Sequence, residues 1–372
     1  MSDQPTGVRF AAGAVMPGSD PLRAASLLES ELAAPHSPAL PELPARGHHA
    51  SLLGRAAAQL TELYAELTSY GWRLVQRPGA DHLRARALLR GDVDALADAR
   101  GTRSEAGLAV AGALSLEMLG PVSLAARLAV PSGEKVLIDH GARRDLAQSL
   151  ALGAAEHVAH VLRTAGPQRL TVVLLEPDYA RVRAGEVATV SGYRSIRALP
   201  REETRQLIHA VVGAMRAAGA HEVLLDTGSA VGAEHVEDFF GSSSTTARSA
   251  AAASGVDGFG LPLPTLDARD WERAAELVEA GAVLRAGMLS GPSAEAESSL
   301  QELPEVSQLV ARLGDPWRAL GMPPASLESW VLTPWRVADR EVTQRLGEVH
   351  AMRLVTRVRD AAEALTDHIR SQ

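Results

Sequence analysis

The stretch HEVLLDTGSAVGAEH, residues 221–235, places two histidines and three acidic side chains within fifteen positions. Imidazole and carboxylate groups are ligands of zinc and of harder divalent cations, so the stretch could form part of a metal site. Its VLL run is typical of a buried strand, with His221 before the strand and Asp226 at its end. At about 3.3 Å per strand residue the two side chains lie about 15 Å apart and cannot share one ion. Glu234 and His235 follow in the next helix or loop, so we expect no metal site built from the two histidines.

Two carboxylates that end strand-like runs are the candidate catalytic residues. Glu176 follows RLTVVLL and precedes Pro177, and Asp226 follows EVLL. A carboxylate in such a position can act as a general base, anchor a substrate, or simply cap the next element. All of these roles stay open for Glu176. In a barrel of parallel strands, chemistry takes place at the carboxyl ends of the strands, so we expect both residues at one mouth.

Two further side chains are candidate ligand contacts at the same mouth. Asp20, in MPGSDPLRAASLL, precedes Pro21, an order typical of a helix N-cap. The free N–H groups at such a helix start could also hold a carboxylate or a phosphate. Arg336, in LTPWRV, follows the last strand-like run and would add a cation there.

The remaining paired histidines have a simpler interpretation. His157 and His160, with Glu156, have a spacing that could chelate a metal on one helix face. They lie in an amphipathic stretch that we expect on the outside of a barrel, which predicts a solvated face. We interpret His48 and His49, in a proline-rich loop, in the same way.

Strand-like and helix-like runs alternate along the chain, and several strand-like runs are continuously apolar, as in strands buried on both faces. The strand candidates are 8–16, 71–79, 107–116, 169–177, 222–228, 257–264, 282–289 and 329–334, and the clearest amphipathic stretches are 51–69, 82–99 and 143–166. Eight strands alternating with helices favour an α/β fold of the (β/α)8 TIM-barrel type. An open doubly wound sheet fits the same alternation, but no G-x-G-x-x-G follows the first strand.

Two irregular stretches interrupt this alternation. Residues 34–49 are rich in proline, and we expect them to run extended over the surface. Residues 239–255 are rich in Ser, Thr and Ala, which predicts a loop or a frayed helix. Neither stretch is long enough to mark a domain boundary. We therefore expect one barrel domain over 1–372, with an irregular N-terminal part and loop insertions.

The composition narrows the class of protein further. The chain has no cysteine, which excludes disulfides and thiolate zinc ligands, and its net charge of −8 with interspersed arginines gives no basic stripe for nucleic acid. The longest apolar run, 106–120, contains Glu117 and is shorter than the ~20 residues of a membrane helix. The start MSDQPTGVRF lacks the pattern of a signal peptide. We expect a cytoplasmic protein that binds neither nucleic acid nor membrane, with a small molecule as the possible partner. The oligomeric state stays open.

Short motifs occur along the chain in a characteristic order: MPGSDP, LPELPARG, GWRLVQRPG, GPVSLAARL, LDHGARRDLAQSLA, Glu-Pro after a strand, SGYRSIRAL and VLTP. Together they resemble the short, stand-alone cobalamin-independent methionine synthase family, in the barrel superfamily that also contains uroporphyrinogen decarboxylase. The resemblance implies a barrel that methylates a homocysteine-like thiol in methionine biosynthesis, with zinc as Lewis acid and methyl-tetrahydrofolate as donor. It also implies substrate contacts at Ser191 and Tyr193, beside Asp20 and Arg336.

The metal-binding motifs of that family are missing. The departures are Leu224 to Thr227 in place of a His-x-Cys element, 257–264 without its carboxylate, Trp335 and Arg336 in place of the last cysteine, Ala14-Val15 in place of Gly-Ser, and Leu175 in place of an acid. Five changes together indicate a dismantled zinc and thiol site. We therefore predict no metal ligands and expect no cofactor.

Three functions stay open for such a chain. The first is a methyltransferase that still works through another ligand set, although an oxygen-rich site suits Mg²⁺ or Mn²⁺ and activates thiols poorly. The second is a metal-free barrel that binds or transforms a small charged metabolite. The third is a non-catalytic homologue that acts through protein partners. Turnover of homocysteine, binding without turnover, and partner-dependent effects would distinguish them.

Overall fold

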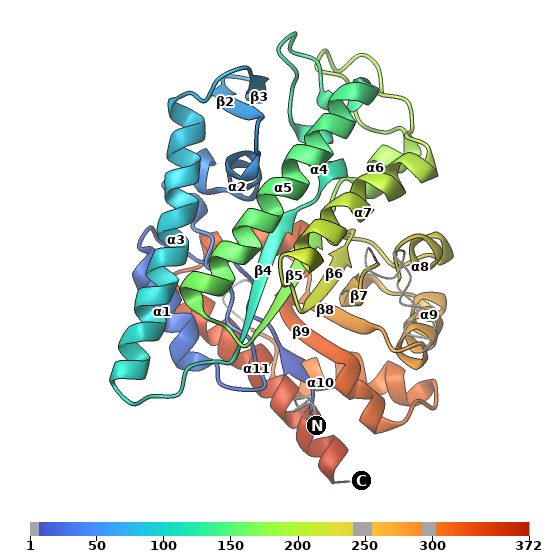
Figure 1. Ribbon diagram of the computed structural model, residues 1–372. Helices are drawn as coiled ribbons and strands as arrows, with labels where there is room; N and C mark the ends of the chain where they lie inside the picture. The colour runs from blue at the N-terminus through green and yellow to red at the C-terminus, as the bar shows by residue number, and fades with distance from the viewer. Residues whose placement is uncertain (1–6, 241–254, 292–302, 372) are drawn as a thin grey trace.

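Seven parallel strands curl around a common axis, and helices cover them on the outside (Figure 1). The computed structural model describes residues 7–240, 255–291 and 303–371. In sheet order the strands are β1 (Arg9–Phe10), β9 (Trp330–Trp335), β8 (Val283–Leu289), β7 (Gly258–Pro262), β6 (Glu222–Asp226), β5 (Arg169–Leu175) and β4 (Ala113–Leu119). The prediction of an α/β barrel of the TIM type is confirmed.

The segment 37–42 lies between β1 and β4 and completes the ring of parallel strands. Ser37 donates its N–H to Phe10 at 2.8 Å, and Leu40 donates to Ser115 of β4 at 3.1 Å. Pro38 has no N–H, but its carbonyl accepts from Ser115 at 2.8 Å. The expectation that 34–49 is a surface segment is wrong for residues 38–43, which are buried. The prolines fit because the residues between them supply the donors that a ladder requires.

The prediction that residues 71–79 form a strand of the barrel is also wrong. Residues 71–75 form β3 (Gly71–Val75), which pairs with the antiparallel strand β2 (Tyr64–Thr68) in a separate two-stranded sheet and makes an isolated bridge to Ala129. Trp72 and Leu74 are buried while their neighbours are partly exposed. This alternation is typical of an antiparallel ribbon with one solvated face. The predicted helix 51–69 accordingly ends at Gln59.

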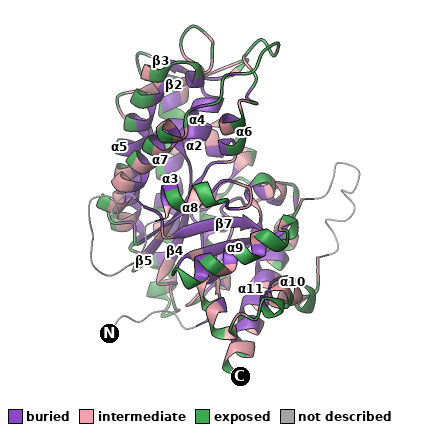
Figure 2. Cartoon of the chain, turned by 90° about the vertical axis from the view of Figure 1, so that its right-hand side faces the viewer, coloured by how far each residue is buried: buried purple, intermediate pink, exposed green. Residues whose placement is uncertain are grey.

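Helices surround the barrel, with their buried faces turned inward (Figure 2). They are α1 (Pro21–Glu31), α2 (Leu52–Gln59), α3 (Ala80–Glu105), α4 (Pro121–Arg127), α5 (His140–Ala165), α6 (Tyr179–Ala184), α7 (Arg201–Ala217), α8 (Ala233–Phe239), α9 (Ala268–Glu279), α10 (Val306–Ala319) and α11 (Glu348–Arg370). The predicted helices at 82–99 and 143–166 are confirmed as parts of α3 and α5. Most of the Ser/Ala-rich stretch 239–255 lies outside the described residues.

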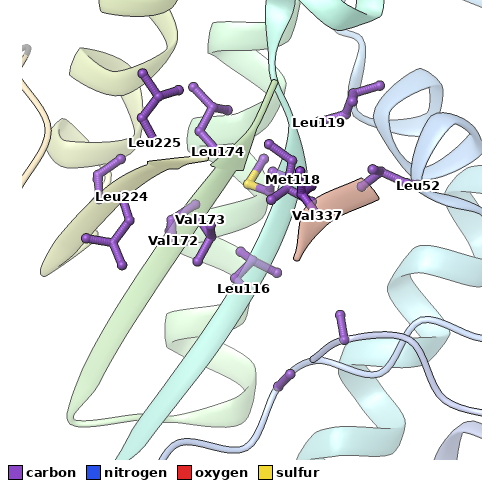
Figure 3. Packing of buried hydrophobic residues seen from close by; sticks show 14 of the residues in the cluster. Leu52, Leu116, Met118, Leu119, Val172, Val173, Leu174, Leu224, Leu225 and Val337 are labelled. Atoms are coloured by element: carbon purple, nitrogen blue, oxygen red, sulfur yellow. The ribbon is translucent and has the colours of Figure 1, made fainter. Parts of the chain in front are cut away.

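The core is aliphatic, as the low aromatic content of 3% requires. Figure 3 shows side chains of β4, β5 and β6 packed together, among them Leu116, Val172 and Leu224. These strands are buried on both faces, which explains their continuously apolar sequence. None of the helices in the described ranges is long and apolar enough to cross a membrane.

Candidate functional site

Asp226 ends β6, and its side chain points into the barrel. The residue is 4% exposed, and its carboxylate accepts the N–H of Gly228 at 2.9 Å and lies 3.3 Å from Nη1 of Arg285 on β8. Gly260 of the neighbouring strand β7 makes room for it, since a Cβ there would lie 2.2 Å from the Asp226 carboxyl carbon. A side chain at position 260 would therefore displace the carboxylate.

Arg285 joins Asp226 to a larger set of charges at the mouth. Its Nη2 donates to Oε1 of Glu117 on β4 at 2.5 Å and to Oγ1 of Thr333 on β9 at 3.2 Å. Arg340 binds the other oxygen of Glu117 at 2.7 Å and both oxygens of Glu42, at 2.8 and 3.2 Å. We call Glu42, Glu117, Asp226, Arg285 and Arg340 the mouth network. All five are buried.

The two arginines set the charge states of the mouth network. Burial alone would raise the pKa of Glu117, but the charges of Arg340 and Arg285 outweigh it and hold that pKa below its usual value. Burial raises the pKa of Asp226, because Arg285 is farther from it and offsets the loss of hydration only in part. With all five groups ionised, three carboxylates face two guanidinium groups.

A 3₁₀ segment after β9, Val337–Arg345, packs against the mouth network. It supplies Arg340, and Oγ1 of Thr343 accepts the indole N–H of Trp335 at 2.9 Å. The cavity that remains between these residues has a volume of about 10 Å³. That is room for about one water molecule and for no substrate.

Glu176 lies beside Asp226 in the sheet, but its side chain serves a different element. Its backbone N–H donates to the carbonyl of Asp226 at 2.7 Å, whereas its carboxylate accepts the N–H groups of Val122 and Ser123 at 2.9 and 2.6 Å. Those groups begin α4, so the carboxylate has the geometry of a helix cap. Burial raises the pKa of Glu176 to about 7, so it is partly protonated near neutral pH.

The other predicted contact residues do not reach the mouth network. Asp20 is exposed and caps α1 by accepting the N–H of Arg23 at 3.1 Å. Ser191 pairs with Thr189 at 3.1 Å, and Tyr193 is 93% exposed in the same loop. Arg336 pairs with Asp339. Their roles as substrate contacts stay predictions.

The histidines of 221–235 are apart from one another, as expected. His221 accepts the N–H of Leu170 at the start of β5, at 3.1 Å, and His235 accepts that of Gly232 at the start of α8, at 2.9 Å. His49 pairs with Asp81 at 2.8 Å. The expected solvated face is wrong for His157, which is only 7% exposed because its side of α5 packs against α2 and α3.

The mouth does not fit a zinc ion. Its carboxylate oxygens are held by Arg285 and Arg340, whose fixed positive charges would repel a divalent cation. Within the described part of the chain, no group of three or more His, Cys, Asp or Glu could hold a metal.

Of the residues in the mouth network, only Asp226 was predicted from the sequence as a site residue. Arg285 had a visible signal, because it is the one charge inside the apolar run AVLRAGML, and Glu117 had the same signal within 106–120. A charge in the middle of a buried strand requires a buried partner. Glu42 and Arg340 lie in irregular segments and carry no comparable signal.

Comparisons with known proteins agree with the fold. A B12-independent methionine synthase from Shewanella sp. W3-18-1, in complex with selenomethionine, matches with a TM-score of 0.53 and 9% identity, over 98% of this chain and 100% of that one. An exo-β-1,4-mannosidase from Opitutaceae bacterium strain TAV5 matches more loosely, with a TM-score of 0.45 and 13% identity, over 100% of this chain and 62% of that one. No protein-family model matches the sequence. No curated protein matches it either. The likeness shows the barrel fold and a distant structural similarity to a methionine synthase.

Proposed function

We propose that this protein is a metal-free, methionine-synthase-like barrel that binds a small charged metabolite and does not methylate a thiol at its mouth. The observation that carries the proposal is the mouth network, in which each arginine contacts two carboxylates. A zinc-dependent methyl transfer requires a Lewis acid beside a thiol. Arginines occupy this region instead.

The chemistry of the mouth network also disfavours a metal-free route to the same reaction. A guanidinium group stays protonated at any physiological pH and cannot accept the proton of a thiol. The carboxylates that could accept it are held in ion pairs. Among the described residues, the cavity within the mouth network has a volume of about 10 Å³, which is too small for a homocysteine-sized molecule. The mouth network is therefore best explained as part of the core.

A second cavity favours binding of a metabolite over the alternative of a non-catalytic homologue that acts through protein partners. It has a volume of about 520 Å³ and lies outside the barrel, between α3 and α5. This volume falls within the ~300–1,000 Å³ range of small-molecule sites. We therefore place the binding site in this outer cavity and not at the barrel mouth, where the resemblance places the methyl transfer.

Metal content and methyl transfer test the proposal together. Purified, unchelated protein should contain far less than one zinc per chain by mass spectrometry. It should form no methionine from homocysteine and methyl-tetrahydrofolate, with or without added zinc. Arg340→Ala serves as a matched variant, because it opens the mouth without adding a metal ligand, and it should also form none. Stoichiometric zinc together with methionine formation by the wild type would overturn the proposal.

A further inference from the structure

The cavity between α3 and α5 is formed by three helices that do not contribute to the barrel mouth network. Helix α3 supplies Arg86, Arg90 and Asp94, and α5 supplies Glu156, His157, His160 and Arg163. The end of α2 and the residues after it, Gln59 to Thr61, also line it. We call this the α3–α5 cavity. In Figure 1 the two long helices flank α2 on one side of the barrel.

Tight backbone packing fixes the shape of the α3–α5 cavity. The hydroxyl of Ser149 on α5 donates to the carbonyl of Thr61 at 2.7 Å. Gly153 lies directly against the end of α2, since a Cβ at this position would be 1.4 Å from the carbonyl oxygen of Gln59. The end of α2 is thus held against α5 by contacts that only a glycine and a small hydroxyl allow.

Three arginines surround the cavity without partners. Arg86, Arg90 and Arg163 have no ion pair or hydrogen bond within the part of the chain that the structure describes. Nearby arginines are different: Arg46 and Arg55 both bind Asp92, at 2.7 and 2.6 Å. Unpaired guanidinium groups that converge on one cavity form a favourable site for an anion, most of all a phosphate.

Two histidines also lie beside the cavity. Nε2 of His157 and Nε2 of His160 are buried, and neither has a hydrogen-bond partner in the described residues. Both atoms are closed off from the open space of the cavity, so a ligand there contacts the arginines and not these nitrogens.

We propose that the α3–α5 cavity binds a sugar phosphate, with Arg86, Arg90 and Arg163 on the phosphate group. The carboxylates of Asp94 and Glu156, which also line the cavity, accept hydrogen bonds from sugar hydroxyls. No aromatic ring other than the two imidazoles is among the lining residues, so a nucleobase has no stacking partner. The positive charges of the three arginines also disfavour a metal cation at His157 and His160. This inference supplies the ligand class for the metabolite binding proposed above.

Isothermal titration calorimetry with ribose 5-phosphate, inorganic phosphate and ribose tests the inference on the full chain. Ribose 5-phosphate should bind the wild type, inorganic phosphate should bind at least tenfold more weakly, and ribose should not bind. The double variant Arg90→Gln/Arg163→Gln, with one change on each helix, should weaken ribose 5-phosphate at least tenfold. The control Arg84→Gln/Arg144→Gln removes the same charge from exposed positions of the same helices outside the cavity and should bind like the wild type.

Three results would overturn the inference: no heat of binding with ribose 5-phosphate at millimolar concentration, equal losses in both double variants, or tighter binding of ADP than of ribose 5-phosphate. Methionine formation, measured on the same preparation, separates this inference from the proposed function. Protein that binds ribose 5-phosphate and also forms methionine would overturn the metal-free proposal and leave the sugar-phosphate site standing. Protein that neither binds ribose 5-phosphate nor forms methionine would overturn the sugar-phosphate site and leave the metal-free proposal standing.

Discussion

The arginines of the barrel mouth and those of the α3–α5 cavity are the same residue type in opposite circumstances. Arg285 and Arg340 have side chains that are 4% and 10% exposed, and each contacts two carboxylates. Arg90 and Arg163 are exposed and contact none in the described residues. A buried charge must be paired to persist, whereas a charge at an open cavity can be solvated or bind a ligand. We therefore interpret the paired arginines of the mouth as structural and the unpaired arginines of the α3–α5 cavity as ligand-binding.

The largest effect should come from removing a paired charge at the mouth. Arg340→Met leaves Glu42 and Glu117 buried without their main partner, which should cost about 3–5 kcal/mol of the free energy of unfolding. Urea unfolding at pH 7 measures it. Arg318→Met is the matched control, because Arg318 is exposed and pairs with Asp315 alone among the described residues, so its loss should cost under ~1 kcal/mol. Equal effects would mean that the mouth network does not stabilise the fold.

The cap on α4 should have the next largest effect. Glu176→Ala leaves the N–H groups of Val122 and Ser123 without an acceptor in a buried position, at a cost of about 3 kcal/mol in the free energy of unfolding. Glu176→Gln keeps one carbonyl oxygen and should cost less. Thermal and urea unfolding of both variants would show this order. A fully stable Glu176→Ala protein would return the residue to the catalytic role predicted from its position.

Acid should destabilise the protein in part through His157. In the unfolded chain the ring takes up a proton near pH 6.5, but in the folded protein its pKa is about 3, so between these values the unfolded chain binds more protons. Stability from this group is present above pH 6.5 and is lost as pH falls. From pH 7 to pH 5 the wild type should lose about 2 kcal/mol more than His157→Leu. His48→Leu, at an exposed position, should follow the wild type, and an identical pH profile for His157→Leu would refute the buried neutral ring.

Gly153→Ala is the variant for which we expect the smallest loss of stability. Its Cβ would lie 1.4 Å from the carbonyl oxygen of Gln59, so the end of α2 must move away from α5. We expect a loss of about 1–3 kcal/mol in the free energy of unfolding and weaker binding in the α3–α5 cavity. Gly91→Ala on α3, where a Cβ would meet nothing within 4 Å, is the control and should change neither. Unaltered binding by Gly153→Ala would show that the floor of the cavity does not shape the site.

The sequence is sufficient for the barrel because most of its strands are continuously apolar. Strands β5, β6 and β8 lie within predicted runs for that reason. The segment 37–42 was missed because its prolines resemble those of a loop, and only its neighbours on both sides make it part of the ring. The alternation of Trp72 and Leu74 with partly exposed residues could have separated the β2–β3 ribbon from the barrel.

The site was harder to predict than the fold because it depends on distant pairs. Arg285 and Glu117 are 168 residues apart, and Arg340 and Glu117 are 223 apart. No local pattern shows that a carboxylate at a strand end will be neutralised by an arginine from elsewhere. His157 was placed on a solvated face for a related reason, since the packing of α2 and α3 against α5 buries it.

Hydrogen–deuterium exchange with and without ribose 5-phosphate tests most directly the claim that binding has moved away from the barrel mouth. We predict slower exchange in peptides that cover 86–94 and 153–163, and no change in 337–345. Protection confined to 337–345 and the carboxyl ends of the strands would contradict it. That result would place the ligand at the mouth, with the mouth network opening to receive it.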